Sequence, residues 1–136
     1  MRGLFLLAAI LAATPSLAST SSGWIDTDAA EKMAKQMREE RMRLIDLDCR
    51  PDTSKADERS AFLMTWEPNT DNRQWSWREA AAAVVQDYKR DFAGKGFRLV
   101  VERSFVMPSG KKRACALWQK SSGKDPVGPG NPPPNR

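Results

Sequence analysis

The 136-residue sequence contains no histidine and only two cysteines. The lack of histidine excludes the Ser-His and Cys-His pairs of nucleophilic enzymes and removes the commonest zinc ligand. Cys49 and Cys115 are too far apart in sequence to form a CxxC redox or metal motif. A phosphate-binding glycine-rich loop is also missing, because Gly94 and Gly96 lack the required spacing. These absences disfavour the familiar enzyme classes, and we expect no metal or other cofactor.

The sequence also lacks a hydrophobic run long enough to span a membrane. The run at residues 4–13 is about half of the roughly 20 residues that a spanning helix needs. Arg2 precedes it, and Pro15 and a small-residue segment, Ser-Leu-Ala, follow it, which is the pattern of a secretory signal peptide. We predict that residues 1–18 are a cleaved signal peptide, with an uncleaved N-terminal anchor as the alternative. The protein is then periplasmic or secreted, with no transmembrane segment after cleavage.

The cysteine content fits this location. An exported chain meets oxidising conditions, so a disulfide between Cys49 and Cys115 is the default expectation. Closing a loop of this length stabilises the folded state by about 4 kcal/mol in the chain-entropy model. Two buried free thiols are the alternative.

The rest of the chain reads as one unit present twice. Residues 43–45, Arg-Leu-Ile, align with residues 98–100, Arg-Leu-Val, and the segments around them also correspond. Each copy is predicted to contain a helix, a strand, a polar loop and a second strand that ends in tryptophan. We place the copies at about residues 24–68 and 75–120, within a single domain spanning residues 19–120. The Pro- and Gly-rich segment 121–136 is expected to be a disordered tail.

Apolar residues at helical spacing predict one helix in each copy. The stripe of the second copy consists of Ala81, Val84, Val85, Tyr88 and Phe92, and that of the first consists of Ala30, Met33, Ala34 and Met37. Ser76, with Glu79 three residues later, has the pattern of a capping box, so we expect the second helix to begin there.

Alternating apolar residues at 97–102 and 114–118, separated by a Pro- and Gly-containing loop, predict a β-hairpin in the second copy. A helix followed by a hairpin, present twice, predicts an α+β fold. In it, two degenerate helix-plus-β-hairpin repeats form one antiparallel sheet of about four strands, with the helices packed on one face. Because one copy alone cannot bury its apolar stripe, the two copies should share one core.

The second copy resembles the bacterial tandem repeat domain, a unit of about 50 residues found in secreted bacterial proteins. The matching residues are Tyr88, Phe92, Gly96, Phe97, Arg98, Leu99, Val100 and Trp118, with a degenerate counterpart in Met33, Met37, Met42, Arg43, Leu44, Ile45 and Trp66. In the first copy, methionine replaces each aromatic residue and Arg41 replaces the glycine. Repeats of that family are non-catalytic modules, sometimes placed before a serine hydrolase domain of the β-lactamase type, as in polyglycine hydrolases. The resemblance implies the fold and the export, and it assigns no catalytic residue.

The polar segment between the copies holds the first candidate binding residues, Trp75, Trp77 and Arg78. Exposed indoles beside arginine suit stacking on a sugar or contact with a partner protein. The alternative is structural, because Trp75 directly precedes the expected Ser76 cap and can act as a hydrophobic staple against the helix.

Basic residues supply the second candidate site. Residues 88–136 carry 11 basic and 3 acidic side chains. Lys111, Lys112 and Arg113 lie at the predicted hairpin turn, and with Lys95, Arg98 and Arg103 they would form a patch for an anionic polymer. Protection of a turn and a strand edge against aggregation is the alternative use of these lysines.

These features predict a non-enzymatic binding or interaction module of the cell envelope, whose partner is an envelope protein or a glycan. An electrostatic binder of anionic cell-surface polymer is the alternative. A second alternative is a small envelope hydrolase that uses carboxylates alone, from pairs such as Asp46 with Asp48 or Glu39 with Glu40. We do not expect a nucleic acid partner.

Overall fold

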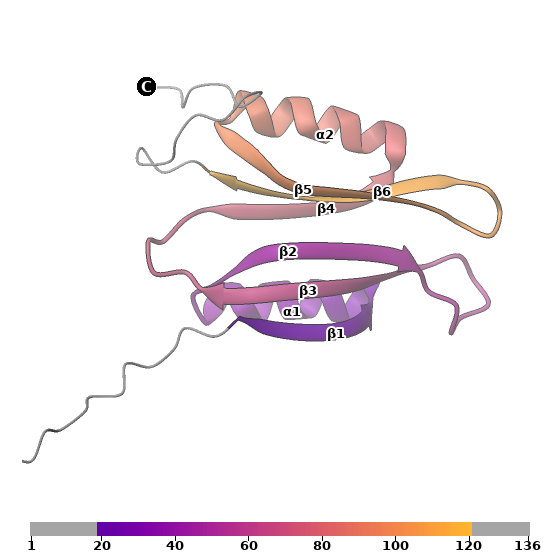
Figure 1. The fold of residues 1–136 in the computed structure, drawn as a ribbon, viewed down its shortest axis with the longest axis horizontal. Helices are drawn as coiled ribbons and strands as arrows, with labels where there is room; N and C mark the ends of the chain where they lie inside the picture. Colours follow the sequence, from indigo (N-terminus) through magenta and orange to yellow (C-terminus); the bar gives the residue numbers. More distant parts are fainter. Residues whose placement is uncertain (1–18, 121–136) are drawn as a thin grey trace, which may run out of the picture.

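The computed structural model describes residues 19–120, in which the element order β-α-β-β occurs twice (Figure 1). The first unit comprises β1 (Thr20–Asp26), α1 (Thr27–Glu39), β2 (Met42–Pro51) and β3 (Ser60–Pro68). The second comprises β4 (Trp75–Ala81), α2 (Ala82–Gly94), β5 (Phe97–Val106) and β6 (Lys112–Lys120). Within these residues, neither helix has the length and apolar character needed to cross a membrane. The predicted signal peptide and tail lie outside the described residues.

Each unit forms its own three-stranded antiparallel sheet. The first sheet has the order β1-β3-β2 and the second has the order β4-β6-β5. The predicted α+β class is therefore confirmed, whereas the predicted single sheet of about four strands is not what forms. The difference arises from β1 and β4, two short edge strands that the predicted helix-plus-hairpin units did not include.

The start of the second helix corrects the predicted capping box. Ser76 and Glu79 both lie in β4, and α2 begins at Ala82 with Ala81 as an N-cap that has no side-chain hydrogen bond. In the first unit a side-chain cap does form, because Asp26 accepts a hydrogen bond from the backbone N–H of Ala29 at 2.8 Å. That hydrogen bond lowers the pKa of the Asp26 carboxyl.

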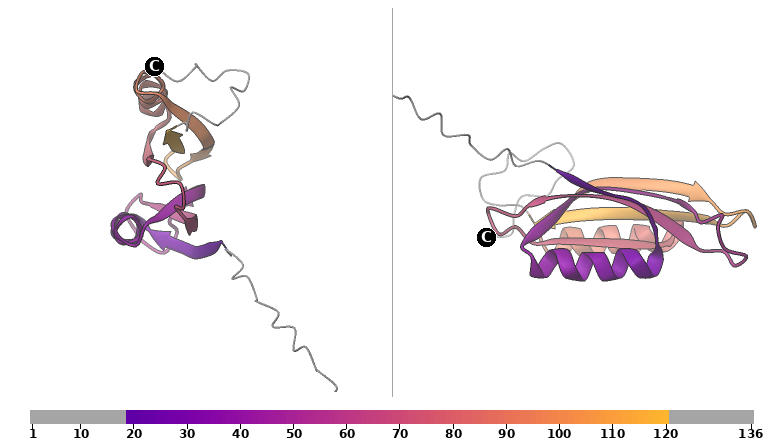
Figure 2. Two further views of the ribbon diagram at one scale, coloured as in Figure 1. Left: turned by 90° about the vertical axis from the view of Figure 1, so that its left-hand side faces the viewer. Right: turned by 90° about the horizontal axis from the view of Figure 1, so that it is seen from below.

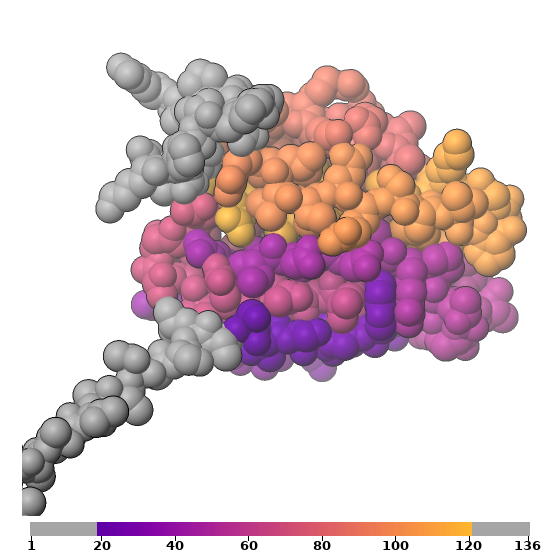
Figure 3. Space-filling model, viewed as in Figure 1, coloured from indigo at the N-terminus to yellow at the C-terminus, as the bar shows by residue number. Residues whose placement is uncertain are grey.

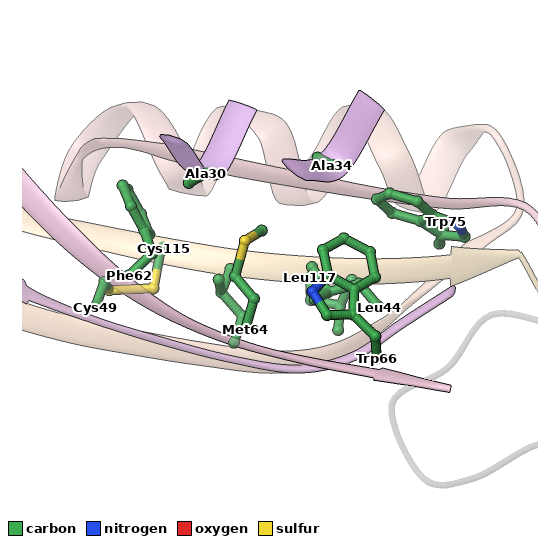
Figure 4. Close-up of a cluster of buried hydrophobic side chains, with 11 residues drawn as sticks. Ala30, Ala34, Leu44, Cys49, Phe62, Met64, Trp66, Trp75, Cys115 and Leu117 are labelled. Carbon is green, nitrogen blue, oxygen red and sulfur yellow. A yellow bond between two sulfur atoms is a disulfide. The ribbon is translucent and has the colours of Figure 1, made fainter. Parts of the chain in front are cut away.

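The two units share one core (Figure 4). Ala30 and Ala34 of α1 face a layer of side chains from β3, among them the fully buried Phe62, Met64 and Trp66. β6 is buried on both faces, since its side chains alternate between two clusters. The β6 residues Cys115 and Leu117 join the shared core, and Ala114, Ala116 and Trp118 pack against Val85 and Phe92 of α2. Figure 2 shows that α1 and α2 lie toward the same side of the molecule.

The predicted disulfide is present and joins the two units. Cys49 of β2 is bonded to Cys115 of β6, with a Cα–Cα distance of 6.3 Å. Both cysteines are buried, so the bond lies within the shared core rather than at its surface.

Polar contacts join the basic second unit to the acidic first unit. Arg103 of β5 pairs with Asp46 at 3.5 Å and with Asp48 at 3.7 Å, and its Nε donates to the carbonyl oxygen of Leu47 at 3.3 Å. The β5–β6 turn is tied to the β2–β3 loop, because Ser109 donates to Glu58 from both its N–H and its hydroxyl at 2.8 Å. Part of the positive charge of the second unit is therefore paired with carboxylates of the first unit.

Candidate binding groove

A groove of about 640 Å³ runs between α1 and the edge strand β4. We call it the β4 groove. Its α1 wall includes Glu31, Lys35 and Arg38, and its β4 wall includes Trp77, Arg78 and Glu79. Because α1 belongs to the first unit and β4 to the second, the groove exists only where the two units pack together.

The free side of β4 follows from the sheet order and register. Among the strands that the structure describes, β4 pairs only with β6, and Trp75 lies opposite Gln119. The preceding pair, Gln74 and Lys120, is hydrogen-bonded, because the N–H of Lys120 donates to the carbonyl oxygen of Gln74 at 2.8 Å. Since hydrogen-bonded and non-hydrogen-bonded pairs alternate in an antiparallel ladder, Trp75, Trp77 and Glu79 direct their backbone groups away from β6.

Arginine side chains donate hydrogen bonds to two carbonyl oxygens of this free edge. Arg38 donates from Nη2 to the carbonyl oxygen of Trp75 at 3.3 Å, and Arg78 donates from Nη1 to that of Trp77 at 2.7 Å. Within residues 19–120, no hydrogen bond is formed by the outward N–H groups of Trp77 and Glu79. The edge therefore presents free donors at Trp77 and Glu79, while the carbonyl oxygens of Trp75 and Trp77 are already bonded.

The structure places the two candidate tryptophans largely in the core. Trp75 is 7% exposed and packs edge-to-face on Trp66, with ring centroids 5.4 Å apart. Trp77 is half-buried and packs on Phe62 at 5.3 Å, so only part of its indole reaches the β4 groove. The hydrophobic staple expected for Trp75 is wrong, because Ser76 lies in a strand and caps no helix.

Arg78 is the most accessible of the candidate residues in the groove. Its side chain is exposed, and it donates to the Ser76 hydroxyl at 2.9 Å. The guanidinium carbon lies 5.3 Å from the ring centroid of Phe92 and 5.7 Å from that of Tyr88, both on α2. These rings hold the cation beside the free edge of β4.

Glu79 gives Arg113 a different role from that of its neighbours. Arg113 donates to Glu79 from Nη2 at 3.0 Å, and the Ser60 hydroxyl donates to the same carboxylate at 2.8 Å. The hydrogen bond to Glu79 raises the pKa of Arg113. Arg113 is thus paired with Glu79, a residue of the groove wall, whereas Lys111 and Lys112 stay exposed at the hairpin turn.

The basic residues named from the sequence do not form one patch. Phe97 pairs with Lys120 at one end of the β5–β6 hairpin, and Val106 pairs with Lys112 at the other. Lys95 and Arg98 therefore lie at the opposite end of β5 from the hairpin lysines. Figure 3 shows the hairpin tip beside the β2–β3 loop, at one end of the molecule.

A second hollow of about 540 Å³ adjoins the β4 groove at its Gln74 end. The two share Arg38 and Ser76 in their walls. The charged residues of the described chain that line this hollow are all basic, namely Arg38, Arg73 and Lys95. Arg73 is paired with Asp71 at 3.0 Å, so Arg38 and Lys95 supply most of the available positive charge.

The carboxylate pairs considered for hydrolysis are not gathered into one site. Asp46 and Asp48 both pair with Arg103, while Glu39 lines the β4 groove and Glu40 accepts a hydrogen bond from Gln36 at 3.0 Å. In the described part of the chain, no three Cys, Asp or Glu side chains are grouped so as to hold a metal ion. The two carboxylate pairs therefore do not form a shared site.

Comparisons with protein-family models, curated proteins and solved structures give no match to this chain. The resemblance to the bacterial tandem repeat domain therefore stays a prediction from the residues named above.

Proposed function

We propose that the protein is an exported, non-enzymatic binding module of the cell envelope and that the β4 groove is its binding site. The observation that supports this most directly is the free edge of β4. The N–H groups of Trp77 and Glu79 have no partner within the described residues, and they open onto a groove large enough for a ligand. A sheet edge left open beside a groove is a common place for a protein to receive a partner.

Two further parts of the proposal concern location and family. A periplasmic or secreted location is supported by the buried disulfide, because such bonds persist in oxidising compartments. Relationship to the bacterial tandem repeat domain is supported by the element order β-α-β-β, which occurs twice. The last strand of each unit also carries a tryptophan near its end, Trp66 in β3 and Trp118 in β6.

An affinity pull-down from the cell envelope tests the groove. The groove variant carries Lys35→Glu and Arg78→Glu, two exposed residues of opposite walls. The matched control carries Lys111→Glu and Lys112→Glu, which changes the charge equally at the hairpin turn. Both variants are first shown to have the same midpoint of unfolding in urea as the wild type.

We expect the wild type and the hairpin variant to retain a common partner that the groove variant loses. A partner lost only by the hairpin variant would contradict the proposal and favour binding of an anionic polymer. We favour the groove because Arg103 and Arg113, two cations of the second unit, are already paired with carboxylates.

A further inference from the structure

We infer that the ligand of the β4 groove is an extended peptide segment with acidic side chains, which pairs through its main chain with the free edge of β4. This inference rests on the proposed function and adds the chemical class of the partner. It is independent of whether the partner is a whole protein or a short peptide.

The spacing of the free donors suits a β-strand. Trp77 and Glu79 are two residues apart on an extended strand, so their outward N–H groups are about 6.4–6.8 Å apart. Alternate carbonyl oxygens of an incoming strand have the same repeat and accept from both donors at once. A compact ligand such as a monosaccharide offers no such repeat.

The β4 groove lies where an added strand would pair with β4. The β4 groove lies on the side of β4 that faces away from β6, and its far wall is α1. Arg38 reaches across from α1 to the carbonyl oxygen of Trp75 and closes the distance at that end. The strand is therefore expected to pair beside Trp77 and Glu79, where no side chain from α1 bonds to the edge.

The polar groups of the edge favour a ligand rich in acceptors. The carbonyl oxygens of Trp75 and Trp77 already accept from Arg38 and Arg78, whereas the N–H groups of Trp77 and Glu79 are unused, so the edge offers more free donors than free acceptors. Side chains of an added strand alternate between its two faces. One face meets Lys35 and Arg38 on α1, and the other meets Arg78 above the α2 rings. Carboxylates on either face thus find a cation.

The acids of the groove reduce this preference without reversing it. Glu79 is bonded to Arg113, and Glu31 and Glu39 lie one turn before and one turn after Lys35 on α1. The adjoining hollow adds Lys95, and among residues 19–120 it has no acidic lining residue. The positive charge is therefore greatest at the Gln74 end, and we expect the acidic residues of the ligand to concentrate there.

The experiment uses peptides selected from a displayed library of random short sequences, panned against the mature protein. Exchange of backbone amide protons is then followed by NMR with and without a selected peptide. We expect the selected peptides to be rich in Asp and Glu and to slow exchange at Trp77 and Glu79 about tenfold or more. Replacing alternate peptide bonds of the ligand by esters, whose carbonyl oxygens are weaker hydrogen-bond acceptors, should weaken binding about tenfold when the esters face Trp77 and Glu79 and little in the other register.

Two variants check the role of charge. Arg78→Gln is expected to weaken the selected peptide about fivefold, whereas Arg90→Gln, an exposed arginine of α2 outside the groove, should leave it unchanged. Selected peptides that are basic or apolar would overturn the inference. So would protection on a strand other than β4, or protection of β4 by self-association at high protein concentration without any peptide.

The outcomes separate this inference from the proposed function. If the pull-down finds a partner that depends on the groove, yet panning yields no peptide that protects Trp77 and Glu79, the groove binds something other than an extended strand. If neither experiment depends on the groove, both proposals fail.

Discussion

The guanidinium of Arg38 lies 4.1 Å from the ring centroid of Trp75 and donates a hydrogen bond to the carbonyl oxygen of the same residue. Arg38 is near the end of α1, and Trp75 is the first residue of β4. This contact connects the two units and fixes how far α1 stands from the free edge of β4. The β4 groove is therefore a product of packing between the units.

Trp75→Ala should destabilise the protein strongly. The indole is almost fully buried against Trp66, and removal of a buried tryptophan side chain costs about 3–5 kcal/mol. Trp77→Ala should cost less, because Trp77 is only half-buried. The free energy of unfolding in urea measures both. Equal and small losses of the free energy of unfolding would show that neither indole belongs to the core. Both tryptophans would then again be candidates for exposed binding residues.

Loss of the disulfide should lower stability without changing the fold. Cys49→Ala with Cys115→Ala removes a bond that spans 66 positions, and we expect a loss of about 4 kcal/mol in the free energy of unfolding. The wild type treated with a reducing agent should unfold at the same urea concentration as the double variant. A reduced wild type as stable as the oxidised one would contradict the role of the bond in joining the units.

Leu117→Ala tests whether the two units share one core. Leu117 belongs to the second unit but packs among the first unit's residues, and it is fully buried. The expected loss is about 2–5 kcal/mol, with a single unfolding transition by both tryptophan fluorescence and circular dichroism. Val85→Ala, in the separate cluster under α2, is the matched control and should also unfold in one step. Two separate transitions would mean that the units fold independently.

The contact between Glu58 and Ser109 should make stability depend on pH. The hydrogen bond from the Ser109 hydroxyl, together with that from its N–H, lowers the pKa of Glu58 from 4.5. Because the unfolded chain takes up this proton at a higher pH than the folded protein, the contact contributes fully above pH 4.5 or so. Its contribution is lost as the pH falls through the lowered folded value.

Glu58→Gln checks this dependence. The variant should be less stable than the wild type near neutral pH, and the difference should shrink as the solution is acidified. Glu31→Gln replaces an exposed glutamate for which no bond to another described residue is formed, and it should change little at either pH. A Glu58→Gln deficit that stays constant down to the acid limit would exclude ionisation as its cause.

Much of the packing could be predicted from the sequence where the apolar pattern is strong. The spacing of Ala30 and Ala34 predicts the buried face of α1, and alternation along residues 114–118 predicts β6. The cysteines, one in each half, predict the bond between the units. These signals succeed because each reflects a face that is buried whatever the neighbouring element is.

The edge strands were harder to predict. β1 has few apolar residues, and β4 runs directly into α2, so Glu79-Ala80-Ala81 favours a helix locally while the strand pairing with β6 prevails. The alternation of Trp75 and Trp77 with polar residues was the available strand signal. The β4 groove had no sequence signal of its own, because it depends on the position of α1 relative to another unit.

Photo-crosslinking from α1 tests the central claim most directly. A photoreactive phenylalanine analogue replaces Lys35, which lines the β4 groove, or Gln36, the next residue, which is exposed outside it. Successive helix positions point about 100° apart, so the pair samples two faces of one helix. We predict that irradiation in the native envelope gives a crosslinked partner from position 35 and none from position 36. Equal crosslinking from both positions, or a partner captured only from position 36, would contradict a binding site in the β4 groove.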